Sequence, residues 1–217
     1  MQIEADHKQA DFLRHTDKPN LYFTAYMPGM MNECTPKPLR YAALSQFLHW
    51  FMALGLIVAF VMGAVMTDIK GISPLKLKLY NWHKWLGVVL WALCLLRWVW
   101  RFVKRPPAPP QGMSALQKNM ATGMHYLLYM AMFTVPLTGY FYSLAAGYPV
   151  VLFGMIELPV LIPKTLDWAE PLKEIHEIST KVLLGLTGMH VAAALWHQWI
   201  LRDGLIWRIL PDWMQRR

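Results

Sequence analysis

Charged residues are scarce in this chain. Asp, Glu, Lys and Arg together make up 16% of its 217 residues, whereas hydrophobic residues make up 56%. In soluble domains about a quarter of all residues are charged, so this composition excludes an ordinary soluble domain. The net charge is +8, but the basic residues stand mainly at the ends of apolar runs. Basic residues in those places are typical of membrane topology, and we therefore exclude nucleic acid as a partner.

Cysteine is almost absent as well. Cys34 lies in a polar stretch and Cys94 lies inside an apolar run, so we expect no disulfide between them. No C-x-x-C-H motif occurs, which excludes covalent attachment of a c-type haem. The first fifteen residues, MQIEADHKQADFLRH, are acidic and polar, and we expect no signal peptide there.

Four long apolar runs dominate the rest of the chain. They are predicted to cross a membrane at about 44–66, 82–103, 122–144 and 175–201, because each has the ~20 residues that ~30 Å of hydrocarbon requires. In lipid, backbone groups must find hydrogen bonds inside their own segment, so these spans are predicted to be helices. Pro136 and Gly139 predict a kink in the third span. The predicted fold class is an all-α integral membrane four-helix bundle.

The bundle is expected to occupy residues 38–211. Residues 1–37 form a polar tail that we expect to be disordered, and Met31 offers an alternative start; residues 212–217 form a short basic tail. In the longest loop, 145–174, an apolar piece around 150–161 is expected to lie at the membrane interface. Basic residues are more numerous at the span ends on the side of the two termini, which predicts that both termini face the cytoplasm.

Histidines are unusually frequent in and beside the predicted spans. Ionisable side chains inside a bilayer are costly and by default mark function. His176 and His190 lie 14 residues apart on one face of the last span, so helical rise separates them by ~21 Å. That distance suits one metal centre in each leaflet. His197 lies only ~10 Å beyond His190, too close for a second macrocycle on the same helix. The six histidines concerned are His49, His83, His125, His176, His190 and His197.

Topology then predicts which histidines pair. The first span enters from the cytoplasm and places His49 at the level of His190, while the second begins at His83, level with His176. Zinc and copper sites need three or four converging ligands, whereas here the ligands come two per level. Two axial imidazoles fill both open positions of a porphyrin iron. We therefore predict two bis-histidine b haems, which carry electrons and leave bond-making to other sites.

Other residues near these pairs have two interpretations each. Arg97 lies 14 residues after His83, and its guanidinium either binds a propionate of the inner haem or snorkels to the cytoplasmic boundary. His125 and His197 either hydrogen-bond a quinone head group and accept its protons or pack at the interface. Small residues either let a flat porphyrin approach the helices or serve close helix packing; these are Gly55, Gly87, Gly185 and Gly188.

The sequence resembles the bacterial di-haem cytochrome b-561 family of the inner membrane. The resemblance covers about residues 38–211 and rests on LSQFLHW around His49 and on NWHKWLGVVLWALCLLRWVWR, which holds His83 and Arg97. It continues through KRPPAPP, MHYLLYMAMFTVPLTGY and HEISTKVLLGLTGMHVAAALWHQWI. The resemblance implies ligation of two haems by His49, His83, His176 and His190, electron exchange with ubiquinone, and a multi-pass protein of the bacterial inner membrane.

Superoxide oxidation at the outer face is a further hypothesis from this resemblance. A family member is understood to take an electron from superoxide and to reduce ubiquinone. In this chain the supporting feature is a group of basic residues on the predicted outer side, which would attract an anion, although short outer loops often hold a few lysines. The group consists of Lys70, Lys76, Lys78 and Lys84.

Two alternatives remain open at this stage. The chain would also suit a membrane cytochrome b subunit of a partner dehydrogenase or hydrogenase, and in that role its electron donor would be a docked protein. A histidine-bearing metal transporter without haem is the alternative from a different class.

Overall fold

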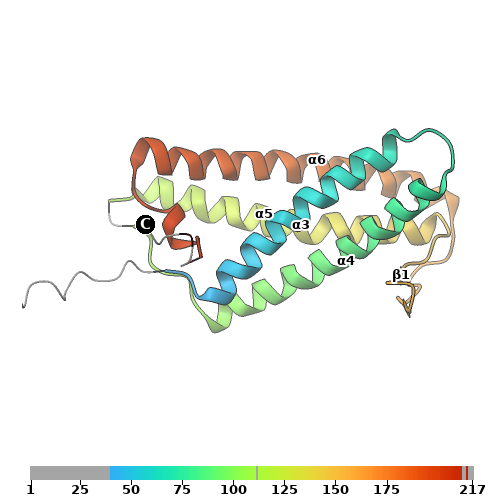
Figure 1. The fold of residues 1–217 in the computed structure, drawn as a ribbon, viewed down its shortest axis with the longest axis horizontal. Coiled ribbons are helices and arrows are strands. Elements are labelled where there is room, and N and C mark those ends of the chain that lie inside the picture. The colour runs from blue at the N-terminus through green and yellow to red at the C-terminus, as the bar shows by residue number, and fades with distance from the viewer. Residues whose placement is uncertain (1–39, 111, 212–213, 215–217) are drawn as a thin grey trace, which may run out of the picture. The chain divides into compact units, whose positions relative to one another are not determined.

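Four long helices form the computed structural model of the protein, which describes residues 40–110, 112–211 and 214 (Figure 1). They are α3 (Ala43–Asp68), α4 (Pro74–Val103), α5 (Ala115–Ala145) and α6 (Leu166–Trp196). A π-helical turn, η1 (His197–Leu201), extends α6, and a 3₁₀ turn, η2 (Ile206–Arg208), follows. All four are long and apolar enough to cross a membrane. The predicted all-α membrane four-helix bundle is confirmed. Both predicted tails lie outside the described residues, apart from Met214.

Three of the four helices begin earlier than the apolar runs indicated. The second, third and fourth were predicted to begin at 82, 122 and 175, but α4 begins at Pro74, α5 at Ala115 and α6 at Leu166. Apolar residues mark the hydrocarbon layer, whereas a helix begins at its cap. Ser73 caps α4 with proline at the first helical position, and Ser114 forms a capping box with Gln117. The added turns are polar and suit the headgroup layer.

Pro136 lies inside α5, and the helix runs through it without interruption. A proline removes one backbone hydrogen bond of a helix, which neighbouring helices and side chains offset in membrane bundles. α5 is therefore one element that reaches from one end of the bundle to the other (Figure 1), and the kink at Pro136 and Gly139 stays a prediction.

Close backbone packing joins α5 to α6, α3 to α4, and α4 to α5. A small apolar core of Met52, Leu90 and Cys94 holds α3 against α4. Gly55 belongs to this contact, because a Cβ there would lie 2.9 Å from Cδ2 of Leu90. By contrast, α6 makes little or no close backbone contact with α3 or α4 within the described residues. The bundle thus has a seam on which α6 faces the other two helices.

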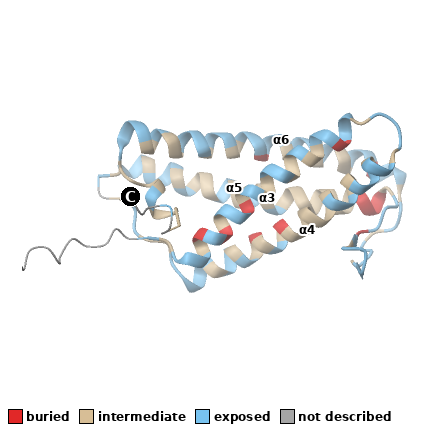
Figure 2. Cartoon of the chain, in the orientation of Figure 1, coloured by how far each residue is buried: buried red, intermediate tan, exposed pale blue. Residues whose placement is uncertain are grey.

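Few residues of the bundle are buried, and most large apolar side chains face outward (Figure 2). Outward apolar side chains are expected where lipid replaces water. In α6 only Ala169 and Leu183 are buried, although Figure 1 shows this helix running alongside α5 for its whole length. The low burial of α6 agrees with a helix whose outward face contacts lipid.

The apolar piece of the longest loop forms a small β-hairpin. Strands β1 (Val151–Leu152) and β2 (Ile156–Glu157) pair antiparallel, and the turn holds Phe153 and Gly154 at positive φ. The indole of Trp85 donates to the carbonyl of Val151 at 2.7 Å, so the hairpin packs against α4.

At the other end of the bundle, the segment after α6 turns back to the start of α3. The N–H of Tyr41 donates to the carbonyl of Arg208 at 3.1 Å, and the indole of Trp50 donates to that of Ile209, also at 3.1 Å. Residues 41 and 208 consequently lie at the same end, as an even number of spans requires.

Candidate haem site

Two pairs of imidazoles meet across the seam of the bundle. The ring centroids of His49 in α3 and His190 in α6 lie 6.3 Å apart, and those of His83 in α4 and His176 in α6 lie 6.4 Å apart. The planes of the two rings cross at 75° in the first pair and at 88° in the second. The structure thus brings together the two pairs that the spacing of the histidines predicted.

The spacing within each pair fits a metal between the rings. A first-row metal lies ~2 Å from an imidazole nitrogen, so two imidazoles on opposite sides of one iron have centroids roughly 6 Å apart once the ring radii are added. Direct ring packing offers no reason for two separate pairs to take this same spacing. Among the described residues, no three His, Cys, Asp or Glu side chains converge as a zinc site requires. The donor set therefore fits the two axial positions of a porphyrin iron.

We name the two pairs after their predicted sides of the membrane, outer for His83 and His176 and inner for His49 and His190. The surroundings of the outer pair are shaped by α5 and α3. Nδ1 of His176 lies 2.9 Å from the carbonyl oxygen of Val135 in α5. A hydrogen bond of this kind fixes the tautomer and leaves Nε2 for a metal. A Cβ at Gly139 would lie 2.9 Å from Cε1 of His176, and one at Gly63 would lie 3.5 Å from Cε1 of His83. Glycine at these two positions gives each imidazole its room.

Some buried polar atoms in the described part of the bundle have no hydrogen bond. They include Nδ1 of His83, Nε1 of Trp91 in the same helix and the hydroxyl of Thr180 one turn after His176, although the carbonyl of Ala59 lies close to the ring of His83. In an apolar setting such atoms are costly unless a partner satisfies them. Their presence fits a site that is completed by a bound polar group.

The glycines expected to admit a porphyrin divide into two kinds. Gly87 in α4 and Gly185 and Gly188 in α6 would each meet open space with an added Cβ. Gly55 does not, since Leu86 and Leu90 fill its surroundings; at this position the helix-packing interpretation holds. Sequence reasoning missed Gly63 and Gly139, because their role depends on a histidine of another helix.

The inner pair of His49 and His190 has a third imidazole and a guanidinium beside it. His125 stacks edge-on against His190, with centroids 5.5 Å apart, and its Nδ1 lies 2.6 Å from the carbonyl oxygen of Ala121. Arg97 is partly buried inside the bundle and does not snorkel outward. Its Nη1 donates to the carbonyl of Ser45 at 2.9 Å and its Nε to the hydroxyl of Tyr129 at 3.1 Å.

These two bonds leave further guanidinium donors of Arg97 for a bound anion. Its charge also acts on His49 and His190, so it lies within electrostatic reach of the inner pair. Binding of a haem propionate by Arg97 therefore stays a prediction, and the guanidinium has the hydrogen-bond donors that it requires.

The remaining predicted residues lie at the two ends of the bundle. His197 is bonded to Asp203 in the turn after α6. Lys84 reaches across to the hydroxyl of Ser143 at 3.5 Å, and Lys76 donates to the carbonyl of Ile69 at 2.8 Å. Lys70 and Lys78 are exposed. Half of the predicted basic group is therefore held by internal hydrogen bonds.

Comparison with known proteins gives the class of this chain. Residues 40–212 match the family described as prokaryotic cytochrome b561, and the chain belongs to that family. It is a membrane b-type cytochrome of electron transfer, in a family that binds b haems. The haem-free metal transporter therefore has no support.

The individual relatives are distant in sequence, but each match extends over almost the full length of the relative. Cytochrome b561 homolog 2 of Escherichia coli (strain K12) is 28% identical over 81% of this chain and 94% of that protein. The probable superoxide oxidase CybB of Yersinia pestis is 25% identical over 79% of this chain and 96% of that protein. Cytochrome b561 homolog 1 of E. coli is 24% identical, with 79% and 97% covered.

Replacing Gly139 by Ala tests how tightly the outer imidazole is held. The new methyl group would meet Cε1 of His176 at 2.9 Å, so we expect this ring to shift and the haem content of the protein to fall. The matched control is Gly123→Ala in the same helix, where the methyl group meets open space. Pyridine haemochrome assays per mole of protein measure the loss; equal haem content in both variants would contradict the assignment.

Proposed function

We propose that this chain holds two b haems, one between His49 and His190 and one between His83 and His176, and moves electrons across the membrane. The observation that carries the proposal is the pair of centroid separations, 6.3 and 6.4 Å, at two levels of one bundle. Since His176 and His190 are 14 residues apart in α6, the two levels lie ~21 Å apart along the helix. Each site then lies in its own leaflet.

A bound haem supplies a one-electron iron couple. What the chain would contribute is two imidazoles to hold each haem, and a haem held in this way would carry electrons and not bind a substrate. The role of these histidines is therefore to hold and orient, with Val135 fixing the ring of His176. Chemistry with substrates must occur at the edges of the sites, through residues that bind an electron donor or acceptor nearby.

The acceptor in this proposal is ubiquinone at the inner end. His125 contacts His190 directly, and His197, the first residue of η1, lies two helical turns beyond His190. Both side chains are imidazoles, whose ring nitrogens can give and take the protons that quinone reduction requires. Their place at the inner end of the bundle supports a role in binding quinone. The proposed location of the protein is the bacterial inner membrane, with both termini in the cytoplasm.

The proposed donor at the outer end is superoxide. One relative carries the name of a probable superoxide oxidase, and the outer end of this chain has exposed cations in Lys70 and Lys78. A cluster of one sign of charge raises the encounter rate with an anion. Lys84, next to His83 in α4 and partly buried, brings a further positive charge close to the outer pair.

Removing one imidazole at a time tests the two-site arrangement. We expect His83→Ala or His176→Ala to lose one haem and to keep most of the other, because the second pair lies ~21 Å away along α6. His49→Ala and His190→Ala should give the complementary loss. Haem stoichiometry and low-temperature spectra of the reduced protein measure the outcome. Loss of both haems from each single change would argue against separate pairs.

Reversing charge at Lys78 tests the attraction of superoxide. Lys78 is exposed, so Lys78→Glu changes the local electric field without breaking an internal hydrogen bond. A double variant with Lys76→Glu reverses a second charge and also removes the hydrogen bond to Ile69. We expect superoxide-driven haem reduction to slow about 10-fold at low salt and to converge on the wild-type rate at high salt. The control is Lys118→Glu, an exposed change at the other end. Stopped-flow rates equal to wild type would remove this donor role for the lysines.

A further inference from the structure

The end of α6 changes its helical geometry at a histidine. Residues His197–Leu201 form a π-helical turn, and Arg202 closes it in the left-handed conformation at φ 51°. The carbonyl of His197 accepts hydrogen bonds from the N–H groups of Arg202 and Asp203. Single π turns are rare and occur frequently at functional sites. Here the wider turn reverses the chain and brings Asp203 back beside the ring of His197.

His197 and Asp203 form a tightly bonded, mostly buried pair. Nδ1 of His197 lies 2.5 Å from Oδ2 of Asp203, and the two side chains are only 15% and 20% exposed. The second carboxylate oxygen, Oδ1, accepts from the backbone N–H of Leu205 at 3.0 Å. With both oxygens fixed, the carboxylate holds the proton of His197 on Nδ1. Nε2 is then the nitrogen that is free to give or take a proton.

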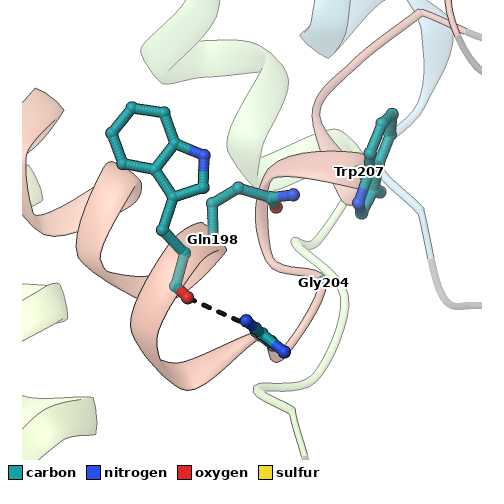
Figure 3. Close-up of a pocket in the computed structure, with 5 residues that line it drawn as sticks. Gln198, Gly204 and Trp207 are labelled. Atoms are coloured by element: carbon teal, nitrogen blue, oxygen red, sulfur yellow. Dashed lines mark hydrogen bonds between the residues drawn. The ribbon is translucent and has the colours of Figure 1, made fainter.

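A surface pocket is lined by residues that neighbour the pair in the chain. His197 lies seven residues after His190, about 10 Å along the helix. The pocket is lined by Gln198, Trp199, Arg202, Gly204 and Trp207 (Figure 3). Arg202 is held there by a hydrogen bond from its Nε to the carbonyl of Trp199 at 3.4 Å. Gln198 directly follows His197 and Gly204 directly follows Asp203, so the pocket adjoins the pair.

We propose that Asp203 is a positioning residue, which holds His197 in the tautomer that delivers protons to a quinone. This role rests on the proposed function. Reduction of a quinone takes up two electrons and two protons, and each carbonyl oxygen becomes a hydroxyl. A haem held by His49 and His190 would supply the electrons. When Nε2 of His197 carries a proton, it gives that proton to one quinone oxygen while Nδ1–H stays bonded to Asp203. Water restores the proton on Nε2 and supplies the proton of the other quinone oxygen.

Asp203→Asn is the direct test, made on the haem-loaded protein in lipid nanodiscs. The amide keeps the shape but removes the charge that holds the imidazolium, so we expect oxidation of the reduced haems by short-chain ubiquinone to slow at least ~10-fold. Haem content and superoxide-driven reduction should match wild type. Asp203→Glu should restore part of the rate. The control is Glu170→Gln, which removes an 80% exposed carboxylate from α6. This change should leave the rate of haem oxidation by ubiquinone unaltered.

A purely structural role of Asp203 predicts different results. If Asp203 acts through His197, then His197→Gln and the double variant His197→Gln/Asp203→Asn react with ubiquinone at the same slow rate. Further slowing in the double variant would overturn the proposal. Nitrogen-15 NMR of histidine-labelled protein gives a readout that does not depend on activity. We expect His197 to be protonated at Nδ1 in the wild type and to lose this preference in Asp203→Asn; protonation at Nε2 alone in the wild type would overturn it.

The same experiment separates this inference from the proposed function. If ubiquinone does not oxidise the haems of the wild-type protein, the proposed acceptor is wrong and the role of Asp203 ends with it. If the wild type and Asp203→Asn react equally fast, ubiquinone stays the acceptor and only the positioning role is removed.

Discussion

The arrangement of the four helices depends on pairs of imidazoles between α6 and the helices α3 and α4, which do not pack closely against α6. Ordinary membrane bundles hold their helices by close backbone approach and small residues, and the contacts of α3 with α4 and of α5 with α6 follow that rule. The seam between α6 and the pair α3–α4 does not. There the imidazoles of each pair approach with ring centroids 6.3 and 6.4 Å apart and with their planes crossing at 75° and 88°. A group bound between the rings would join α6 to α3 and α4.

One helix sets the geometry of both sites. Because α6 carries His176 and His190, its rise fixes the distance between the two levels, and its rotation fixes that both face the same seam. The other helices divide the remaining tasks. α3 and α4 each supply one imidazole, and α5 supports α6 along its length while giving the carbonyl that orients His176. A rotation of α6 would disturb both sites at once, whereas a change in α3 or α4 would disturb one.

Helical periodicity and topology were enough to predict the four spans and the pairing of their histidines. These features depend on the rise of a helix and on which side it enters, and both can be worked out from residue positions. The helix starts at Pro74, Ala115 and Leu166 were missed, since apolarity marks the lipid layer and not the cap. The role of Gly139 was missed because it depends on a neighbouring helix. The same dependence left the choice between porphyrin access and helix packing open at Gly55. Asp203 was missed as well, since a π turn leaves no periodic signal in the sequence.

The partly buried guanidinium of Arg97 has a consequence for the direction of electron flow. A fixed positive charge stabilises an added electron nearby, and Arg97 acts on the imidazoles of the inner pair. An electron that moves inward travels against a membrane potential that is negative inside, at about 2.3 kcal/mol per 100 mV for a full crossing. In the proposed function, Arg97 offsets part of that opposing voltage. The positive charge would in this way lower the energy of an electron at the cytoplasmic end of the bundle.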